Sequence, residues 1–231
     1  MGFKNSCSPN TSSSGVVQKD LPESEVSVMS PLDLGGFKSE EYLKISPQGK
    51  VPSMKCESGL SIAESDTVSR YIMSTYADQG PSFQPDNPRS NQIARFHDLY
   101  LTSIQNCLYK PGPPFGIYGA RKQALAEYSK QLYVIADLMD DDAMYTCGDE
   151  VSLADATLFP SVIFAVHMFP KFDSGLEKPI PPKIEAWFQA LIEKDSAFKK
   201  AYDEVGYILS IFIPGLNLDV SVSHLLHVFL L

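Results

Sequence analysis

The chain has 231 residues, of which 44% are hydrophobic and 20% are charged. That balance is typical of a folded globular protein and excludes a wholly disordered chain, a collagen-like chain or a disulfide scaffold. Nineteen lysines and arginines against 28 aspartates and glutamates give a net charge of −9. A surface of that sign repels phosphate backbones, so we expect no nucleic-acid partner.

Residues 1–24 are rich in Ser, Thr and Asn and show no apolar stretch of the kind found in a secretory signal. Their first six residues match the acylation pattern M-G-x-x-x-S, and Cys7 follows directly. This pattern is short enough to occur often by chance, so we do not expect acylation. We interpret residues 1–24 as an atypical or disordered N-terminal segment.

Residues 25–78 mix short strands with helical pieces. Ser39–Leu43 has acidic residues placed favourably for the start of a short helix. Two short strands are predicted to start near Lys50 and Leu60, joined by a hairpin turn. Apolar residues then recur at helical spacing from Glu64 to Tyr76, which predicts an amphipathic helix.

Residues 79–90 contain too many prolines to be helical and are predicted to be a linker. Residues 91–204 are predicted to be almost entirely helical. One of these helices opens with Ser152 followed by Asp155, the spacing of a capping box. The helical periods cover residues 93–100, 125–139, 152 onward and 182–192.

Residues 205–231 form an apolar tail that Pro214, Gly215 and several polar residues interrupt. A membrane-spanning helix needs about 20 mainly apolar residues without such breaks. We therefore expect the tail to pack on the helical domain or to be an extension of it, and we do not expect membrane association.

The cysteines and histidines show no metal-binding spacing. Four cysteines lie far apart, with no C-x-x-C motif, and the four histidines form no H-E-x-x-H motif. We therefore expect no metal site and no disulfide framework, which fits a reducing, cytoplasmic compartment. The cysteines are Cys7, Cys56, Cys107 and Cys147.

The run from Gly35 to Pro52 resembles a motif of the cytosolic glutathione transferase superfamily, G-x-x-K-S-x-E-[FY]-L-x-[LI]-[NS]-P-x-G-[QK]-V-P. Its second half, ISPQGKVP, is similar to plant dehydroascorbate reductases, whereas its first half is more similar to the phi and theta transferase classes. The pair Glu64-Ser65 and the capping box at Ser152 also follow in the family's order. The resemblance covers about residues 25–203.

The resemblance implies an α+β fold, in which a thioredoxin-like N-terminal domain precedes an all-α helical bundle. Domain limits are then 25–78, 79–90 for the linker, 91–204 for the helical domain and 205–231 for the tail. It also implies a homodimer that detoxifies electrophilic small molecules with glutathione as co-substrate.

Glutathione is a peptide, and the resemblance places it against a cis Val51-Pro52 bond whose exposed backbone pairs with it as an added strand. Glu64 and Ser65 would hold the γ-glutamyl end at a helix start, where free N–H groups attract a carboxylate. The resemblance puts Lys38 and Lys50 at the glycyl carboxylate. For the acceptor, Tyr100, Ile104 and Met168 are candidate wall residues of a site between the domains.

The catalytic position is where the chain departs from the family pattern. The family carries Tyr, Ser or Cys after its first strand, but residues 1–24 show neither that strand nor an amphipathic helix after it. Cys7 is the candidate nucleophile at nearly the right distance, and Ser8 or one of Ser12 to Ser14 could supply a hydroxyl instead. A third interpretation is that none of these residues is catalytic.

These alternatives lead to three hypotheses of function. In the first, the protein is a glutathione transferase that conjugates glutathione to electrophilic, mostly apolar small molecules. In the second, it is a dehydroascorbate-reductase-like enzyme that uses Cys7 for thiol transfer. In the third, it is a non-catalytic binding protein that has lost the catalytic strand.

Overall fold

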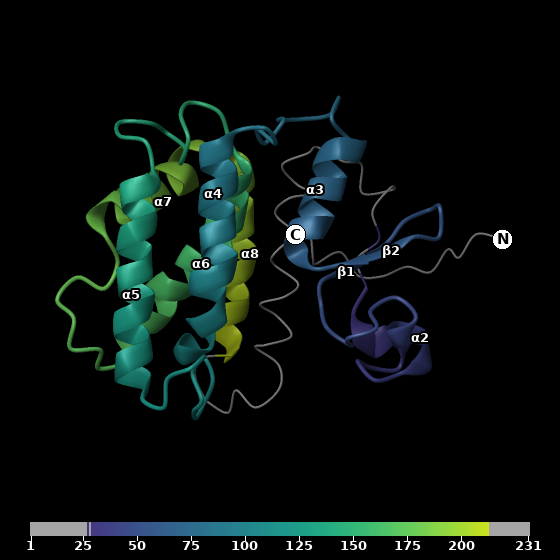
Figure 1. Cartoon of the computed structure of the whole chain (residues 1–231), viewed down its shortest axis with the longest axis horizontal. Helices are drawn as coiled ribbons and strands as arrows, with labels where there is room; N and C mark the ends of the chain where they lie inside the picture. The colour runs from purple at the N-terminus through teal and green to yellow at the C-terminus, as the bar shows by residue number, and fades with distance from the viewer. Residues whose placement is uncertain (1–26, 28, 213–231) are drawn as a thin grey trace.

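The computed structural model describes residue 27 and residues 29–212, with side chains up to Val205. Cys7, the acylation motif and residues 213–231 of the tail lie outside the described residues. The described chain forms two parts, a small unit with a β-hairpin and a bundle of helices, joined by an extended linker (Figure 1). This arrangement agrees with the α+β architecture that the sequence predicts.

The small unit contains short elements whose ends are set by capping side chains. The Ser39 hydroxyl accepts a hydrogen bond from the Tyr42 N–H at 3.1 Å, which starts α2. The hairpin strands are antiparallel, and α3 follows the second strand directly. In chain order the elements are η1 (Pro31–Leu34), α2 (Glu40–Leu43), β1 (Ser53–Lys55), β2 (Ser61–Ala63) and α3 (Ser65–Thr75).

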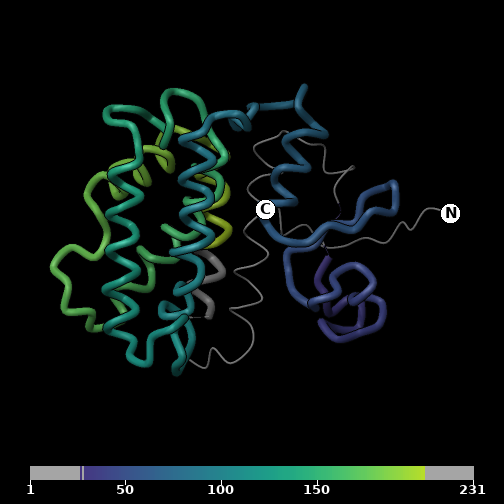
Figure 2. The backbone as a smooth tube through the Cα atoms, viewed as in Figure 1, coloured from purple at the N-terminus to yellow at the C-terminus, as the bar shows by residue number. Residues whose placement is uncertain are grey.

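The helical part is built around α6, which the other helices surround (Figure 2). Twelve of the sixteen residues of α6 are buried, so this helix is apolar on all sides. The elements are α4 (Pro88–Phe96), the π-helical η2 (His97–Leu101), η3 (Thr102–Leu108), α5 (Arg121–Leu138), α6 (Leu153–Met168), η4 (Phe169–Lys171), α7 (Pro182–Lys194) and α8 (Ser196–Phe212).

Each helix predicted from the periodicity is present in the structure. The helix α8 runs on to Phe212, past residue 205 where we expected the tail to begin. In the described chain one stretch, Leu153–Lys171, is long and apolar enough to cross a membrane, but 72% of it is buried among the other helices. It is therefore the core helix of the bundle.

Arg121 fixes the loop between η3 and α5. Its guanidinium lies between the rings of Phe115 and Phe172, 4.5 Å and 4.4 Å from their centroids. It also donates to the carbonyls of Cys107 and Lys110, which come at the end of η3. The Cys107 thiol is fully buried, and that burial raises its pKa to about 12, so this cysteine stays protonated and unreactive.

The linker is anchored where the two parts meet. Phe83 is 3% exposed and packs in one cluster with Met73 of α3, Ala94 of α4 and Leu153 of α6. Its carbonyl accepts a hydrogen bond from the Leu153 N–H at 2.9 Å. Because the cluster holds residues from both parts, it fixes α3 against the helical bundle.

Asp155 organises the start of α6 from a fully buried position. Its carboxylate accepts hydrogen bonds from the Ser152 N–H and hydroxyl at 2.9 Å and 2.7 Å, which forms the predicted capping box. It also accepts from the Thr146 N–H at 2.7 Å and from the Trp187 indole N–H at 3.0 Å. Burial raises the pKa of Asp155, and these hydrogen bonds oppose that shift.

Replacing Asp155 should therefore destabilise the helical part strongly. Asp155→Ala leaves buried donors from α6, its preceding loop and α7 without an acceptor, and we expect a loss of about 3 kcal/mol in the free energy of unfolding. Urea denaturation followed by circular dichroism measures this loss. The exposed neighbour Asp149 provides the matched control, since Asp149→Ala should change stability by less than about 0.5 kcal/mol. Equal stabilities of the two variants would contradict this role of Asp155.

Candidate functional site

The register of the hairpin brings together two segments that are far apart in the sequence. Ser53 pairs with Ala63 in an antiparallel ladder. The ladder ends at this pair, so Val51 and Pro52, just before β1, and Glu64 and Ser65, just after β2, leave the hairpin from the same open end. Four of the predicted glutathione-binding residues therefore lie at the same open end of the hairpin.

The backbone before Val51 is held in place by three hydroxyl groups. The Lys50 carbonyl accepts hydrogen bonds from the Tyr42 hydroxyl at 2.6 Å, the Ser46 hydroxyl at 2.8 Å and the Ser53 hydroxyl at 3.2 Å. Tyr42 and Ser46 are almost completely buried. This set of hydroxyls fixes the direction in which the chain leaves Lys50.

Val51 itself presents an unused backbone edge. The Val51-Pro52 peptide bond is cis, as the sequence predicts, and the Pro52 ring is buried. Within the part of the chain that the structure describes, neither the N–H nor the carbonyl of Val51 has a hydrogen-bond partner. A free N–H and carbonyl on one residue can pair with the backbone of an extended peptide.

The start of α3 provides a second set of unused backbone groups. Glu64 precedes the helix with φ 73° and ψ 126°, a left-handed conformation that costs energy for a residue with a side chain. It does not cap the helix with its side chain, and its carboxylate is exposed. Among the described residues nothing accepts a hydrogen bond from the first N–H groups of α3, so these groups, starting with that of Ser65, can bind an anionic ligand.

Two lysines lie at the other side of Val51. Gly49 has φ +62°, and a Cβ placed there would lie 2.5 Å from the Phe37 carbonyl oxygen, so the two backbones approach closely. That approach brings Lys38 near Lys50, because each lysine is the next residue in its own segment. Both side chains are exposed, and among the described residues neither forms an ion pair.

The structure thus places Val51, Pro52, Glu64 and Ser65 at one end of the hairpin and brings the backbone of Lys38 near that of Lys50, while Cys7 lies outside the described residues. Sequence reasoning missed the role of Tyr42 and Ser46, which hold the Lys50 carbonyl. Both residues lie within the motif from Gly35 to Pro52. Their positions eight and four residues before Lys50 could have indicated that their hydroxyls bind its carbonyl.

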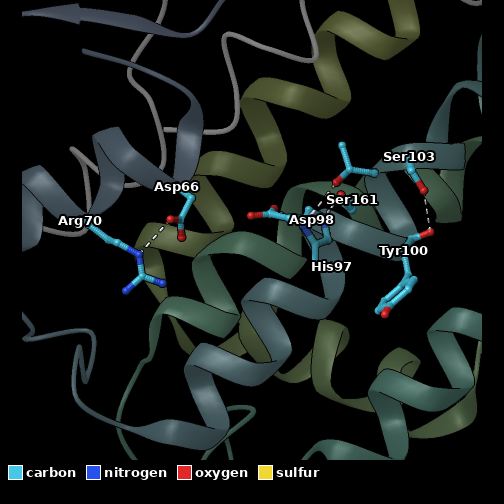
Figure 3. A network of polar contacts seen from close by, with 8 residues as sticks. Asp66, Arg70, His97, Asp98, Tyr100, Ser103 and Ser161 are labelled. Atoms are coloured by element: carbon cyan, nitrogen blue, oxygen red, sulfur yellow. Dashed lines mark hydrogen bonds and ion pairs between the residues drawn. The ribbon is translucent and has the colours of Figure 1, made fainter. Parts of the chain in front are cut away.

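In the helical part, α4 is the helix that shares a buried cluster with α3, the helix whose first turn belongs to this site. The linker returns the chain so that α3 and α4 run antiparallel, with Met73 and Ala94 in one buried cluster (Figure 1). Asp66 and Arg70 lie on the Met73 face of α3, and Asp98 lies one turn after Ala94, in η2. Figure 3 shows the Asp98 carboxylate directed toward the side on which Asp66 lies.

A buried histidine holds α4 to α6 at this level. His97 is 2% exposed, and its Nε2 lies 2.7 Å from the Ser161 hydroxyl, while its Nδ1 lies 3.2 Å from the Asp98 carboxylate (Figure 3). Here α4 widens into the π-helical η2, and α6 contains Pro160, which cannot donate a backbone hydrogen bond. His97 and Ser161 are both buried, so their contact ties two irregular helices together and is not reachable by a substrate.

Two of the three residues that we expected to form the wall of an acceptor site are buried in the structure. Ile104 and Met168 are 5% and 2% exposed and belong to the core of the helical part, so they are not available as a wall. Tyr100 is 48% exposed and stacks on Phe96, with ring centroids 4.5 Å apart. Its ring points away from Asp98 (Figure 3).

Comparison with known proteins agrees with this geometry. Family models described as the N-terminal and C-terminal domains of glutathione S-transferase match residues 17–82 and 119–190, which together make up more than half of the chain. The chain is 26% identical over 186 residues to glutathione S-transferase 3 of Zea mays, an alignment that covers 74% of this chain and 79% of the relative. It is 28% identical over 199 residues to glutathione S-transferase hmp2 of Hypomyces subiculosus, covering 80% and 89%.

Solved structures of glutathione transferases have the same fold as this chain. The crystal structure of poplar glutathione transferase F1 matches with a TM-score of 0.65 at 23% identity and covers 84% of this chain and 91% of that one. Both domains of one family thus occur in order, in the fold that the structure shows. The chain therefore belongs to the cytosolic glutathione S-transferase superfamily.

Proposed function

We propose that this protein conjugates the thiol of glutathione to electrophilic, mostly apolar small molecules. The observation that supports the proposal is that Val51 and the start of α3 lie at the same end of the hairpin, with backbone groups that have no partner among the described residues. A peptide with an amino-acid head and an extended backbone matches both features. Glutathione has this form.

Each part of glutathione has a proposed partner at this end of the hairpin. The γ-glutamyl carboxylate accepts hydrogen bonds from the Ser65 N–H and hydroxyl at the α3 start, and the Glu64 carboxylate pairs with the ammonium group. The cysteinyl backbone pairs with Val51. The glycyl carboxylate lies near Lys38 and Lys50, whose charges have no partner among the described residues.

In the proposed reaction the glutathione thiolate attacks an electrophilic carbon of the acceptor. A carbon–sulfur bond forms, and either a leaving group departs with its electron pair or a proton adds to the product. The described residues bind and orient glutathione, and the thiol proton leaves to solvent. The hydroxyl that favours the thiolate is proposed to lie in residues 1–24, with Ser8 and Ser12 to Ser14 as candidates, whereas Cys7 is the candidate nucleophile of the reductase alternative.

We further propose that the protein acts in the cytoplasm, as a homodimer, and serves to detoxify its acceptors. The family to which the chain belongs supports the dimer. Within the described part of the chain the cysteines are all free, which suits a reducing compartment.

Removing the Ser65 hydroxyl should weaken glutathione binding. Ser65→Ala deletes a hydroxyl that would donate to a charged carboxylate, a contact of about 1.5–3 kcal/mol, so we expect the KM for glutathione to rise about tenfold or more. The measurement is the initial rate of conjugation of a neutral aryl chloride against glutathione concentration. Ser74→Ala, at the opposite end of α3, is the matched control and should leave the KM unchanged.

Three other outcomes would distinguish the alternatives. An unchanged KM in Ser65→Ala would contradict the proposed binding mode. A melting temperature that rises with glutathione, without any turnover, would indicate a non-catalytic binding protein. Turnover with dehydroascorbate that depends on Cys7 would indicate the reductase.

A further inference from the structure

Three hydroxyl groups converge on a single backbone oxygen, that of the Lys50 carbonyl. The hydroxyls of Tyr42, Ser46 and Ser53 donate to it at 2.6 Å, 2.8 Å and 3.2 Å, and we call these three residues the hydroxyl cluster. A backbone carbonyl has two lone pairs, so three donors fill its capacity to accept hydrogen bonds. Lys50 lies outside both α2 and β1, so the hydroxyl cluster holds a loop and not the end of a regular element.

Two of these donors are fixed inside the small unit. Tyr42 and Ser46 are 4% and 1% exposed. The Tyr42 ring packs edge-on against Phe37, with ring centroids 5.7 Å apart. The Ser46 hydroxyl also accepts a hydrogen bond from the Lys50 N–H at 3.2 Å, so one side chain holds both polar groups of the Lys50 backbone. The Lys50 carbonyl is therefore held in one direction, toward the interior of the unit.

The Lys50 carbonyl and the Val51 N–H belong to the same peptide unit. The bond between the two residues is trans, since it is not one of the cis bonds that the described chain contains. In a planar trans peptide the carbonyl and the N–H point in opposite directions. Holding the carbonyl inward therefore directs the Val51 N–H outward, where no described residue accepts a hydrogen bond from it. Hydrogen bonds to the carbonyl also polarise the peptide, which makes its N–H a stronger donor.

We propose that the hydroxyl cluster positions glutathione without touching it, because it directs and strengthens the Val51 N–H that donates to the cysteinyl carbonyl of the peptide. This inference rests on the proposed function, in which the cysteinyl backbone pairs with Val51. Without the hydroxyl cluster, the peptide unit turns among several directions. The apparent affinity for glutathione then falls in proportion to the fraction of molecules whose N–H points at the ligand.

Tyr42→Phe tests this role, because it removes one hydroxyl and keeps the ring that packs against Phe37. We expect the KM for glutathione to rise about fivefold, as the Val51 N–H is then correctly directed in about a fifth of the molecules. The kcat and the KM for the acceptor should change by less than about twofold, since the complex that reacts is the same. The measurement is the initial rate of conjugation of a neutral aryl chloride while each substrate is varied in turn.

Tyr128→Phe is the matched control. The Tyr128 hydroxyl is also buried and also donates to a backbone carbonyl, that of Ser161 in the helical part, at 3.4 Å. This variant loses the same kind of contact but should keep the KM of the unaltered protein for glutathione. Ser53→Ala decides the question should Tyr42→Phe fail to fold, because Ser53 is the least buried member of the hydroxyl cluster. We expect Ser53→Ala to raise the KM for glutathione about threefold.

A second measurement reports on the peptide unit without any ligand. In protein isotopically labelled at the valine nitrogens, the NMR resonance of the Val51 N–H should shift in Tyr42→Phe and keep its position in Tyr128→Phe. The reason is that hydrogen bonds to the Lys50 carbonyl change the polarity of the N–H on the same peptide. A general loss of stability would not produce this difference between the two variants.

A folded Tyr42→Phe variant with the KM of the unaltered protein for glutathione, or with an unmoved Val51 resonance, would overturn the role of the hydroxyl cluster while conjugation persists. A KM that rises as much in Tyr128→Phe would overturn it too. Absence of conjugation by the unaltered protein would instead contradict the proposed function itself. In that case the dissociation constant of an S-alkyl glutathione, measured by calorimetry on the same variants, decides the role of the hydroxyl cluster.

Discussion

The antiparallel pairing of β1 with β2 brings the two backbone parts of the proposed site, Val51 and the start of α3, to one end of the hairpin. Because Ser53 pairs with Ala63, the residues just outside the ladder meet at one open end. A shift of one residue in this register would separate Val51 from the start of α3 and turn each side chain of the strands to the opposite face. The hydroxyls of Tyr42, Ser46 and Ser53 hold one side of that end through the Lys50 carbonyl.

The helical part contributes a rigid opposing surface to this small unit. Its rigidity comes from buried polar contacts that lock the helices, with Asp155 at the start of α6 and His97 at the start of η2, directly after α4. Phe83 then joins the two parts by packing between α3, α4 and α6. The linker therefore both connects the units and holds α3 against the helical bundle.

Much of this arrangement can be predicted from the sequence, because it depends on local patterns. The capping box at Ser152 and the helix after Glu64 each have a short-range signal, whereas the cis bond before Pro52 is implied by the resemblance of the run from Gly35 to Pro52 to the family motif. The structure contains all three. The expectation that Ile104 and Met168 form part of the acceptor wall is wrong. Helical spacing predicts which face of a helix is buried, but it does not predict whether that face packs against another helix or lines a site. The link between His97 and Ser161 spans 64 positions, and no local pattern indicates it.

The most direct measurement is a crystal structure of the full chain with an S-alkyl glutathione, which occupies the peptide site without reacting. The account predicts that the γ-glutamyl carboxylate lies within hydrogen-bond distance of the Ser65 N–H, and that the cysteinyl backbone pairs with the N–H and carbonyl of Val51. A peptide bound away from the α3 start, or a helix start filled by another segment of the chain, would contradict it.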